Sequence, residues 1–243
     1  MSRGEIARSR IFKLSGLPDT IVLEKLNSLA TDNHTSIVCQ AGPGEVRVII
    51  TTRADNSAFT EKQLETVSIK VKETLDEYIF ACDDEIIEEV VGRLLRQGGF
   101  TLATAESCTG GLIAARITDV PGSSDYFKGG VVAYTNEIKQ KFLGVPADVL
   151  EKFSAVSSET ACAMAEGIRT RAASDFGLSV TGIAGPGGDS PGKPVGLVYI
   201  GFCTPEGVTS YRYIFPGNRN EVRQGTANTA LNILKRYLEK QIL

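Results

Sequence analysis

The pattern of apolar and polar positions along the chain predicts two units that both mix helices and strands. In the first unit, Val46, Val48 and Ile50 alternate with other residues, as in a strand with one buried face. Strands are expected over residues 9–15, 36–40 and 46–52, and helices over Thr20–Ala30 and Glu61–Ile79. This order predicts a small α+β domain of the βαββα type over residues 1–84, with the acidic stretch Asp83–Glu85 at its boundary.

The second unit, residues 85–243, is predicted to be a three-layer α/β/α domain because strands and helices alternate along it. Its strands are expected over Phe100–Ala105, Gly130–Thr135, Leu178–Thr181, Val195–Cys203 and Val208–Phe215. Its helices are expected over Glu85–Arg96, from the turn after Ala105 through Thr118, over Asn136–Phe142, Ala147–Phe153 and Ser158–Ala173, and from Asn218 nearly to the C-terminus. The last two strands are adjacent in sequence, so the sheet should be mixed. Asn218 and Glu221 have the spacing of a capping box.

The composition is that of an ordinary globular protein, with 42% hydrophobic and 23% charged residues. No apolar run approaches the roughly 20 residues that span a membrane, and Met1–Glu5 lack the apolar region of a secretory signal. We therefore expect a cytoplasmic location and no membrane partner. The formal net charge is −3, and neither unit is basic enough to indicate binding of nucleic acid.

Cysteine and histidine usage narrows the possible chemistry. The five cysteines are odd in number and far apart, without a CxxC pair, so neither a zinc ribbon nor a disulfide framework is indicated. The only histidine, His34, lies in a loop-like stretch far from the glycine-rich segments. A Ser-His-Asp triad, a Cys-His dyad or a histidine-rich metal site would have to recruit it. If the chain is a hydrolase, its general base is expected to be a lysine, a carboxylate or a tyrosine.

The segment Thr104–Gly111 (TAESCTGG) joins the end of a predicted strand to the start of a helix through a glycine-bearing turn. Free backbone N–H groups at a helix N-terminus attract negative charge, so this turn suits a phosphate or the oxyanion of an attacked carbonyl. Ser107 is the candidate nucleophile. Cys108 is its rival, intrinsically more nucleophilic but without a histidine partner. The same residues also fit a helix cap followed by closely packed glycines.

Three further segments carry candidate residues. Tyr134 and Lys139 lie where a strand passes into a helix, and a desolvated neutral lysine is a credible base for a serine; a surface lysine beside a core-edge tyrosine is the alternative. The glycine-rich loop that begins at Thr181 suits either close approach to a ligand or a flexible connection, and it lacks a Walker A sequence. Arg219 and Arg223, in the first turns of the last helix, suit either a ligand phosphate or solvent.

Taken together, these segments resemble the C-terminal domain of the CinA (competence- and damage-inducible) family, the nicotinamide-nucleotide amidohydrolases. The resemblance runs in order through AESCTGG (105–111), ITDVPGSSDYFKGGVVAYTNEIK (117–139), LGV (143–145), AVSSE (155–159), TGIAGPGG (181–188), KPVGLVYI (193–200) and FPGNR (215–219). One departure is Gly192, where many relatives carry Glu, and it affects no assigned role.

Residues 9–85 resemble the KH-like middle domain of longer family members. Those members begin with a further domain, similar to molybdopterin-binding proteins, which this sequence lacks, so ADP-ribose hydrolysis is not carried over. The KH resemblance does not imply RNA binding, because the local turn is Gly42-Pro43-Gly44 rather than the GxxG that clamps a nucleic-acid backbone, and the unit is acidic.

The resemblance implies hydrolysis of the carboxamide of nicotinamide mononucleotide to nicotinic acid mononucleotide and ammonia, without a metal or a cofactor, in a homodimer. From the residues, we expect Ser107 to be the nucleophile, Lys139 the base and Tyr134 a proton relay or orienting group. Contacts to the substrate or the oxyanion are expected from Thr181, Gly182, Cys108, Thr109, Gly110, Arg219 and Arg223. A different class stays open, a non-catalytic nucleotide-binding module of the competence or DNA-damage response, which would not need Ser107, Tyr134 and Lys139 together.

Overall fold

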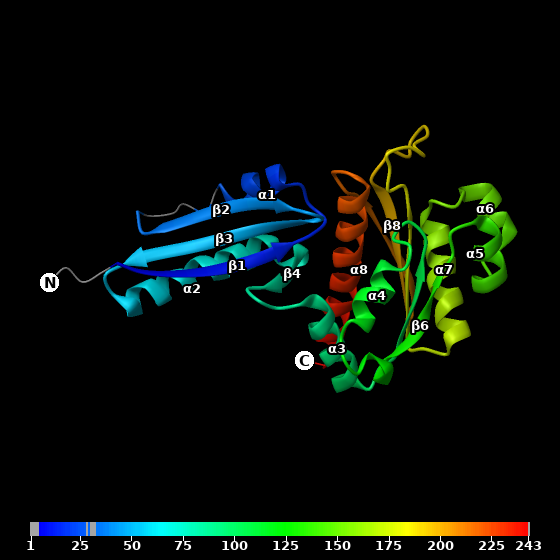
Figure 1. The fold of residues 1–243 in the computed structure, drawn as a ribbon, viewed down its shortest axis with the longest axis horizontal. Helices are drawn as coiled ribbons and strands as arrows, with labels where there is room; N and C mark the ends of the chain where they lie inside the picture. Colours follow the sequence, from blue (N-terminus) through cyan, green and yellow to red (C-terminus); the bar gives the residue numbers. More distant parts are fainter. Residues whose placement is uncertain (1–4, 28, 30–32, 243) are drawn as a thin grey trace.

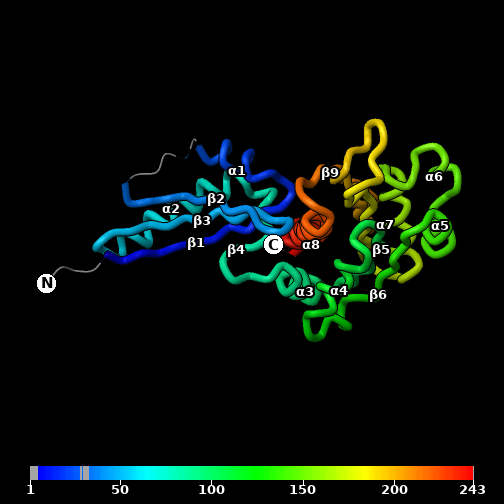
Figure 2. Tube along the Cα trace, turned by 45° about the horizontal axis from the view of Figure 1, so that its top comes forward, coloured from blue at the N-terminus to red at the C-terminus, as the bar shows by residue number. Residues whose placement is uncertain are grey.

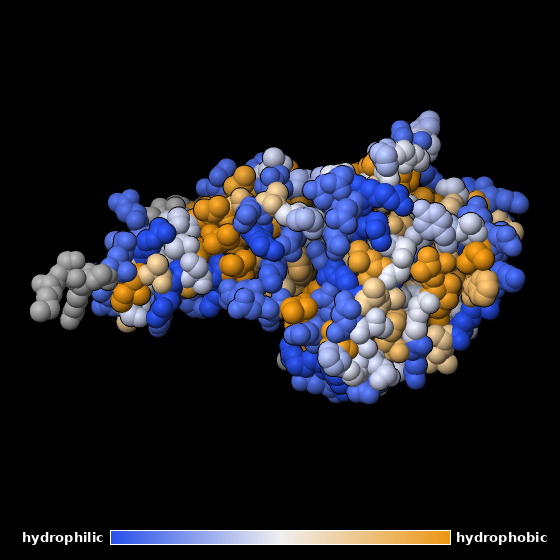
Figure 3. Space-filling model, in the orientation of Figure 1, coloured by the Kyte–Doolittle hydropathy of each residue, from blue (hydrophilic) through white to orange (hydrophobic). Residues whose placement is uncertain are grey.

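The computed structural model describes residues 5–27, 29 and 33–242, and it contains two units that each carry a sheet (Figure 1). Residues 1–4, which belong to the Met1–Glu5 stretch without a signal-like apolar region, lie outside this description. Within it, no helix combines the length and the apolar character needed to cross a membrane. On the face drawn in Figure 3, apolar residues form separate patches on both units among hydrophilic ones.

The first unit is a four-stranded antiparallel sheet on which α1 and α2 pack. Its elements are β1 (Ile6–Leu14), α1 (Asp19–Leu26), β2 (Thr35–Gly42), β3 (Glu45–Ala54), α2 (Ser57–Leu75), the 3-10 turn η1 (Asp76–Tyr78) and β4 (Ile79–Cys82). The strand order is β2-β3-β1-β4. Phe12 of β1, Val48 of β3 and Val71 of α2 are fully buried in a core that belongs to this unit alone.

The extent of the second predicted helix was wrong. Helix α2 begins at Ser57 rather than Glu61, where the Asn56 side chain accepts the Phe59 N–H at 3.0 Å, and it ends at Leu75. Residues 79–82 then form β4, which pairs with β1. Four apolar residues after a helical stripe are too few for periodicity to separate a buried strand from a helix end. Helix α1 ends at Leu26, and its predicted end at Ala30 lies outside the described residues.

The second unit has the predicted three layers around a mixed sheet. Its strands are β5 (Leu102–Glu106), β6 (Phe127–Val132), β7 (Phe176–Gly182), β8 (Leu197–Thr204) and β9 (Gly207–Ile214), in the order β6-β5-β7-β8-β9. Strand β5 is parallel to both neighbours, whereas β8 is antiparallel to both of its own. One face carries α3 (Ile87–Gly98), α4 (Leu112–Thr118) and α8 (Arg219–Ile242), and the other carries α5 (Asn136–Leu143), α6 (Ala147–Phe153) and α7 (Ser158–Ala172), with the 3-10 turn η2 (Ser123–Asp125) before β6.

Two local details bear on the site. Strand β6 covers Phe127–Val132 rather than the predicted Gly130–Thr135, because the Thr135 hydroxyl caps α5 by accepting the Ile138 N–H at 3.3 Å. The predicted capping box of α8 is confirmed: the Glu221 carboxylate accepts the Asn218 N–H at 2.7 Å, and the Asn218 side chain accepts the Glu221 N–H at 3.2 Å.

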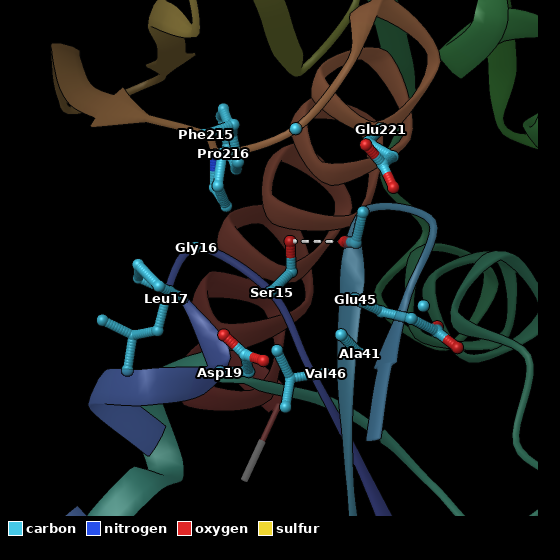
Figure 4. Close-up of a pocket in the computed structure, with 14 residues that line it drawn as sticks. Ser15, Gly16, Leu17, Asp19, Ala41, Glu45, Val46, Phe215, Pro216 and Glu221 are labelled. Carbon is cyan, nitrogen blue, oxygen red and sulfur yellow. Dashed lines mark hydrogen bonds between the residues drawn. The ribbon is translucent and has the colours of Figure 1, made fainter. Parts of the chain in front are cut away.

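Helix α8 lies between the two units in both views (Figures 1 and 2). The Ser15 hydroxyl lies 2.8 Å from the Thr229 hydroxyl, and Asn228 donates to the Gly44 carbonyl at 3.2 Å. A Cβ added to Gly44 would lie 2.2 Å from the Gly225 nitrogen, so the β2–β3 turn and α8 meet backbone to backbone. A junction cavity of about 210 Å³ opens beside this contact, and Ser15 donates to the Gly44 carbonyl at its edge (Figure 4).

Candidate active site

Ser107 follows the last residue of β5, at the edge where the parallel strands end. Its N–H donates to the Val180 carbonyl of β7 at 3.0 Å, and its carbonyl accepts the Gly110 N–H at 3.1 Å. Gly110 and Gly111 have φ of +62° and +92°, which only glycine adopts without strain. The two glycines therefore reverse the chain into α4 immediately after the serine, which keeps 8% of its surface exposed.

Lys139 is brought to Ser107 by helix α5. Its side chain is 1% exposed, and its Nζ lies 3.2 Å from Ser107 Oγ. The same Nζ donates to the carbonyls of Ala133 at 2.7 Å and Tyr134 at 3.3 Å. Burial lowers the pKa of Lys139 from 10.5 to about 8, because a charged ammonium is disfavoured away from water. A lysine in this setting is still mostly protonated at pH 7, but a far larger fraction of it is neutral than of an exposed lysine.

Tyr134 contributes to the site through its backbone. Its carbonyl binds the Lys139 amine, whereas its side chain is 60% exposed and its hydroxyl accepts a hydrogen bond from Arg219 at 3.2 Å. No hydrogen bond among the described residues joins that hydroxyl to Ser107 or Lys139. The structure thus brings Tyr134 to the site without the relay contact that the sequence suggested.

The two arginines expected at a phosphate lie at different depths. Arg219 Nη1 donates to the Gly185 carbonyl of the glycine-rich loop at 2.9 Å, and it joins this loop to Tyr134. Arg223 donates twice to the Thr109 carbonyl, at 3.2 Å from Nε and 2.8 Å from Nη2. Arg223 therefore supports the turn after Ser107, and the more exposed Arg219 lies at the rim of the site.

Thr181 and Gly182 are held by the sheet. The buried Thr181 hydroxyl donates to the Ala155 carbonyl at 2.7 Å, and Gly182 pairs with Val198 of β8. A side chain at Gly182 would lie 2.6 Å from the Leu197 carbonyl, so the glycine there permits strand packing. Both residues follow Val180, which binds the Ser107 amide, but the Thr181 hydroxyl already has a partner.

Glu106 is a site residue that the sequence reasoning missed. Its 1% exposed carboxylate accepts the N–H groups of Ile113 at 3.1 Å and Ala114 at 2.8 Å, at the start of α4. The chain thus supplies its own carboxylate to these two helix-start amides, so they are not available to an anion. An acidic residue before a glycine turn that opens a helix is the sequence signal for such a cap. Among the described residues, the N–H groups of Cys108 and Thr109 donate to no backbone oxygen, and both face the Cys108 thiol, whose pKa they act to lower.

Cys108 and His34 have less suitable settings for chemistry. Burial raises the pKa of the Cys108 thiol to about 12, so it stays protonated at neutral pH. His34 packs edge-on against Phe59 and bonds the Arg53 carbonyl within the first unit. No group of three or more His, Cys, Asp or Glu residues suited to a metal ion occurs in the part of the chain that the structure describes.

The second unit is a mixed α/β domain with a buried serine–lysine pair where its parallel strands end. Residues 84–238 match the family model described as the CinA C-terminal domain, and residues 9–81 match the damage-inducible protein CinA KH domain. The chain belongs to the CinA family.

Similar proteins and solved structures carry the same family name. A competence-damage inducible protein of Desulforudis audaxviator is 48% identical over 98% of this chain and 58% of its own length. One from Caldanaerobacter subterraneus is 48% identical over 97% of this chain and 57% of its own length. The chain thus spans less than two thirds of these relatives. The crystal structure of the competence/damage inducible protein CihA from Agrobacterium tumefaciens superposes with a TM-score of 0.59 at 43% identity, covering 63% of this chain and 95% of that one.

Proposed function

We propose that this chain hydrolyses the carboxamide of nicotinamide mononucleotide, giving nicotinic acid mononucleotide and ammonia, with Ser107 as nucleophile and Lys139 as general base. The substrate class comes from the resemblance to nicotinamide-nucleotide amidohydrolases. The observation that carries the chemistry is the surroundings of one atom, Lys139 Nζ, which has two carbonyls and one serine hydroxyl within 3.3 Å.

Those three neighbours fit the amine in either state, because an ammonium can donate to all three and a neutral amine can turn its lone pair toward Ser107. A neutral lysine has two N–H hydrogens and one lone pair. In the neutral state the two carbonyls, which can only accept, take the two hydrogens, and the lone pair is then left for the proton of Ser107. The two carbonyls therefore orient the base as well as anchoring it. This arrangement supports Lys139 as the group that activates the serine.

The reaction proceeds in two halves. Ser107 Oγ forms a bond to the carboxamide carbon while its proton passes to Lys139 Nζ. The C–N bond then breaks, and the same proton leaves with the amide nitrogen as ammonia, which returns Lys139 to the neutral form. A water molecule next gives a proton to Lys139 and attacks the ester carbon. The ester bond to Ser107 breaks, and the proton returns to Ser107 Oγ as the free acid departs.

Substrate contacts are assigned to the groups next to the nucleophile and to those at the exposed rim. The amides of Cys108 and Thr109, next to the nucleophile, suit the oxyanion of the tetrahedral intermediate. Arg219, at the exposed rim, suits the 5′-phosphate, because a guanidinium pairs with phosphate through two parallel hydrogen bonds. Arg223 acts through the Thr109 carbonyl that it holds.

The test is ammonia release from nicotinamide mononucleotide, the riboside and free nicotinamide, with ADP-ribose, which has no carboxamide, as the compound that should release none. Ser107→Ala should lower ammonia release from the mononucleotide by at least about a thousandfold, and Ser36→Ala, at an exposed serine of the first unit, is the matched control. Tight binding of the nucleotide without ammonia release would favour a binding module. Wild-type activity in Ser107→Ala would rule out the serine mechanism.

A further inference from the structure

Glu106 makes hydrogen bonds to both segments that carry the candidate catalytic residues, the turn after Ser107 and the strand end before Lys139. Its two carboxylate oxygens bind the N–H groups of Ile113 and Ala114, and its backbone carbonyl accepts the Ala133 N–H at 2.7 Å. The Ala133 carbonyl in turn accepts the Lys139 amine at 2.7 Å. One buried residue therefore connects the turn that carries the nucleophile with the carbonyl that holds the base.

The carboxylate has a specific physical reason to be there. The first amides of a helix have no partner within the helix, and α4 begins only five residues after Ser107, at Leu112. A buried carboxylate is stable only when donors satisfy it, and the positive end of α4 provides two. The same hydrogen bonds satisfy the helix amides and the carboxylate. They hold the two ends of the turn, Glu106 and Ile113, together.

We propose that Glu106 is the positioning residue of the Ser107–Lys139 pair: its carboxylate fixes the turn that carries Ser107, and its carbonyl fixes the strand end that holds Lys139. The proposal rests on the amide hydrolysis proposed above, because it assigns a task within that site. Glu106 itself does not touch the substrate. Its effect is to keep Ser107 Oγ and Lys139 Nζ within hydrogen-bond distance, 3.2 Å apart.

The first test is Glu106→Gln. Glutamine has nearly the same shape, but it offers one acceptor oxygen in place of two and turns an NH₂ group toward the second helix amide. We expect kcat to fall by about a hundredfold with KM within about twofold, since misplacing a reacting group by about 1 Å costs roughly this factor. In Glu106→Ala, kcat should fall further, because the side chain offers no acceptor oxygen. Glu151→Gln, at an exposed glutamate of α6, should change neither constant.

A second variant leaves Glu106 unchanged. Ala114→Pro removes the N–H that Glu106 accepts at 2.8 Å, and proline is tolerated in the first turn of a helix. It should lower kcat in the same direction as Glu106→Gln. This variant keeps the test decisive if Glu106→Gln fails to fold.

Labelling of Ser107 by a fluorophosphonate, followed by mass spectrometry, separates the two proposals because it needs no knowledge of the substrate. Labelling of the wild type, slowed about a hundredfold in both variants, supports the positioning role even if nicotinamide mononucleotide releases no ammonia. Equal labelling rates and equal kcat in wild type and both variants overturn it. A wild type that neither labels at Ser107 nor releases ammonia overturns both proposals.

Discussion

The pH dependence of the reaction depends on one group, the Lys139 amine. Lys139 can accept the Ser107 proton only when it is neutral, and burial lowers its pKa from 10.5 to about 8. The Cys108 thiol, which interacts electrostatically with the same amine, has a pKa raised to about 12 by burial and stays neutral over the working range. The rate should therefore rise with pH as the lysine loses its proton, and then level off.

The magnitude follows from the shift. With a pKa of about 8, about a tenth of Lys139 is neutral at pH 7 and about nine tenths at pH 9. An exposed lysine with a pKa of 10.5 would be neutral in only about one molecule in 3,000 at pH 7. Burial thus increases the neutral base about 300-fold at pH 7. We predict that kcat/KM rises about tenfold between pH 7 and pH 9 and is level above pH 9.

The assay is ammonia release at low substrate concentration, so that kcat/KM reports the free protein. Measurements begin at pH 7, because the phosphate of the substrate titrates near pH about 6. Lys139→Arg keeps a positive charge and cannot act as a base, so it should lose at least about a thousandfold in kcat. A rate independent of pH from 7 to 9, or one still rising tenfold per pH unit at pH 10, would refute the role given to Lys139.

Three further predictions concern Cys108 and Arg219 at the site and Gly44 at the junction of the two units. Cys108→Ser should keep kcat within about threefold of the wild type in the ammonia assay, since the thiol is buried and protonated; a loss as large as that of Ser107→Ala would make the thiol the nucleophile. Arg219→Ala should raise KM for the mononucleotide about tenfold and leave KM for the riboside unchanged, because only the mononucleotide has a phosphate. An equal increase of KM for both would show that Arg219 does not bind the phosphate. Gly44→Ala should lower the free energy of unfolding by about 1–3 kcal/mol in urea, since its Cβ would lie 2.2 Å from the Gly225 nitrogen and φ is +71°; an unchanged stability would contradict the tight junction.

The layered fold was predictable because its elements carry strong local patterns. Alternation in β3 and the capping box at Asn218 and Glu221 are both visible in the sequence and both present in the structure. Strand β4 was not predictable, since its four residues continue the apolar pattern of α2 and are distinguished only by pairing with β1. Tertiary pairing leaves no periodicity of its own in so short a segment.

The site was predictable in its residue types and less so in its contacts. The single distant histidine left lysine among the few candidate bases, and the structure brings Lys139 within 3.2 Å of Ser107. The sequence could not show that the Tyr134 backbone, rather than its hydroxyl, binds that lysine. Nor could it show that Glu106 binds the first amides of α4, because a side chain's partner depends on the fold around it.

The most direct test of the central claim is to find where a covalent intermediate forms. The wild type would be mixed with nicotinamide mononucleotide, quenched in acid within milliseconds, digested and analysed by mass spectrometry. If Ser107 is the nucleophile, an ester of the nicotinate nucleotide forms on the peptide that contains Ser107, and both this ester and ammonia release are lost in Ser107→Ala. An adduct on Cys108, or continued turnover in Ser107→Ala without any adduct, would contradict this role of Ser107.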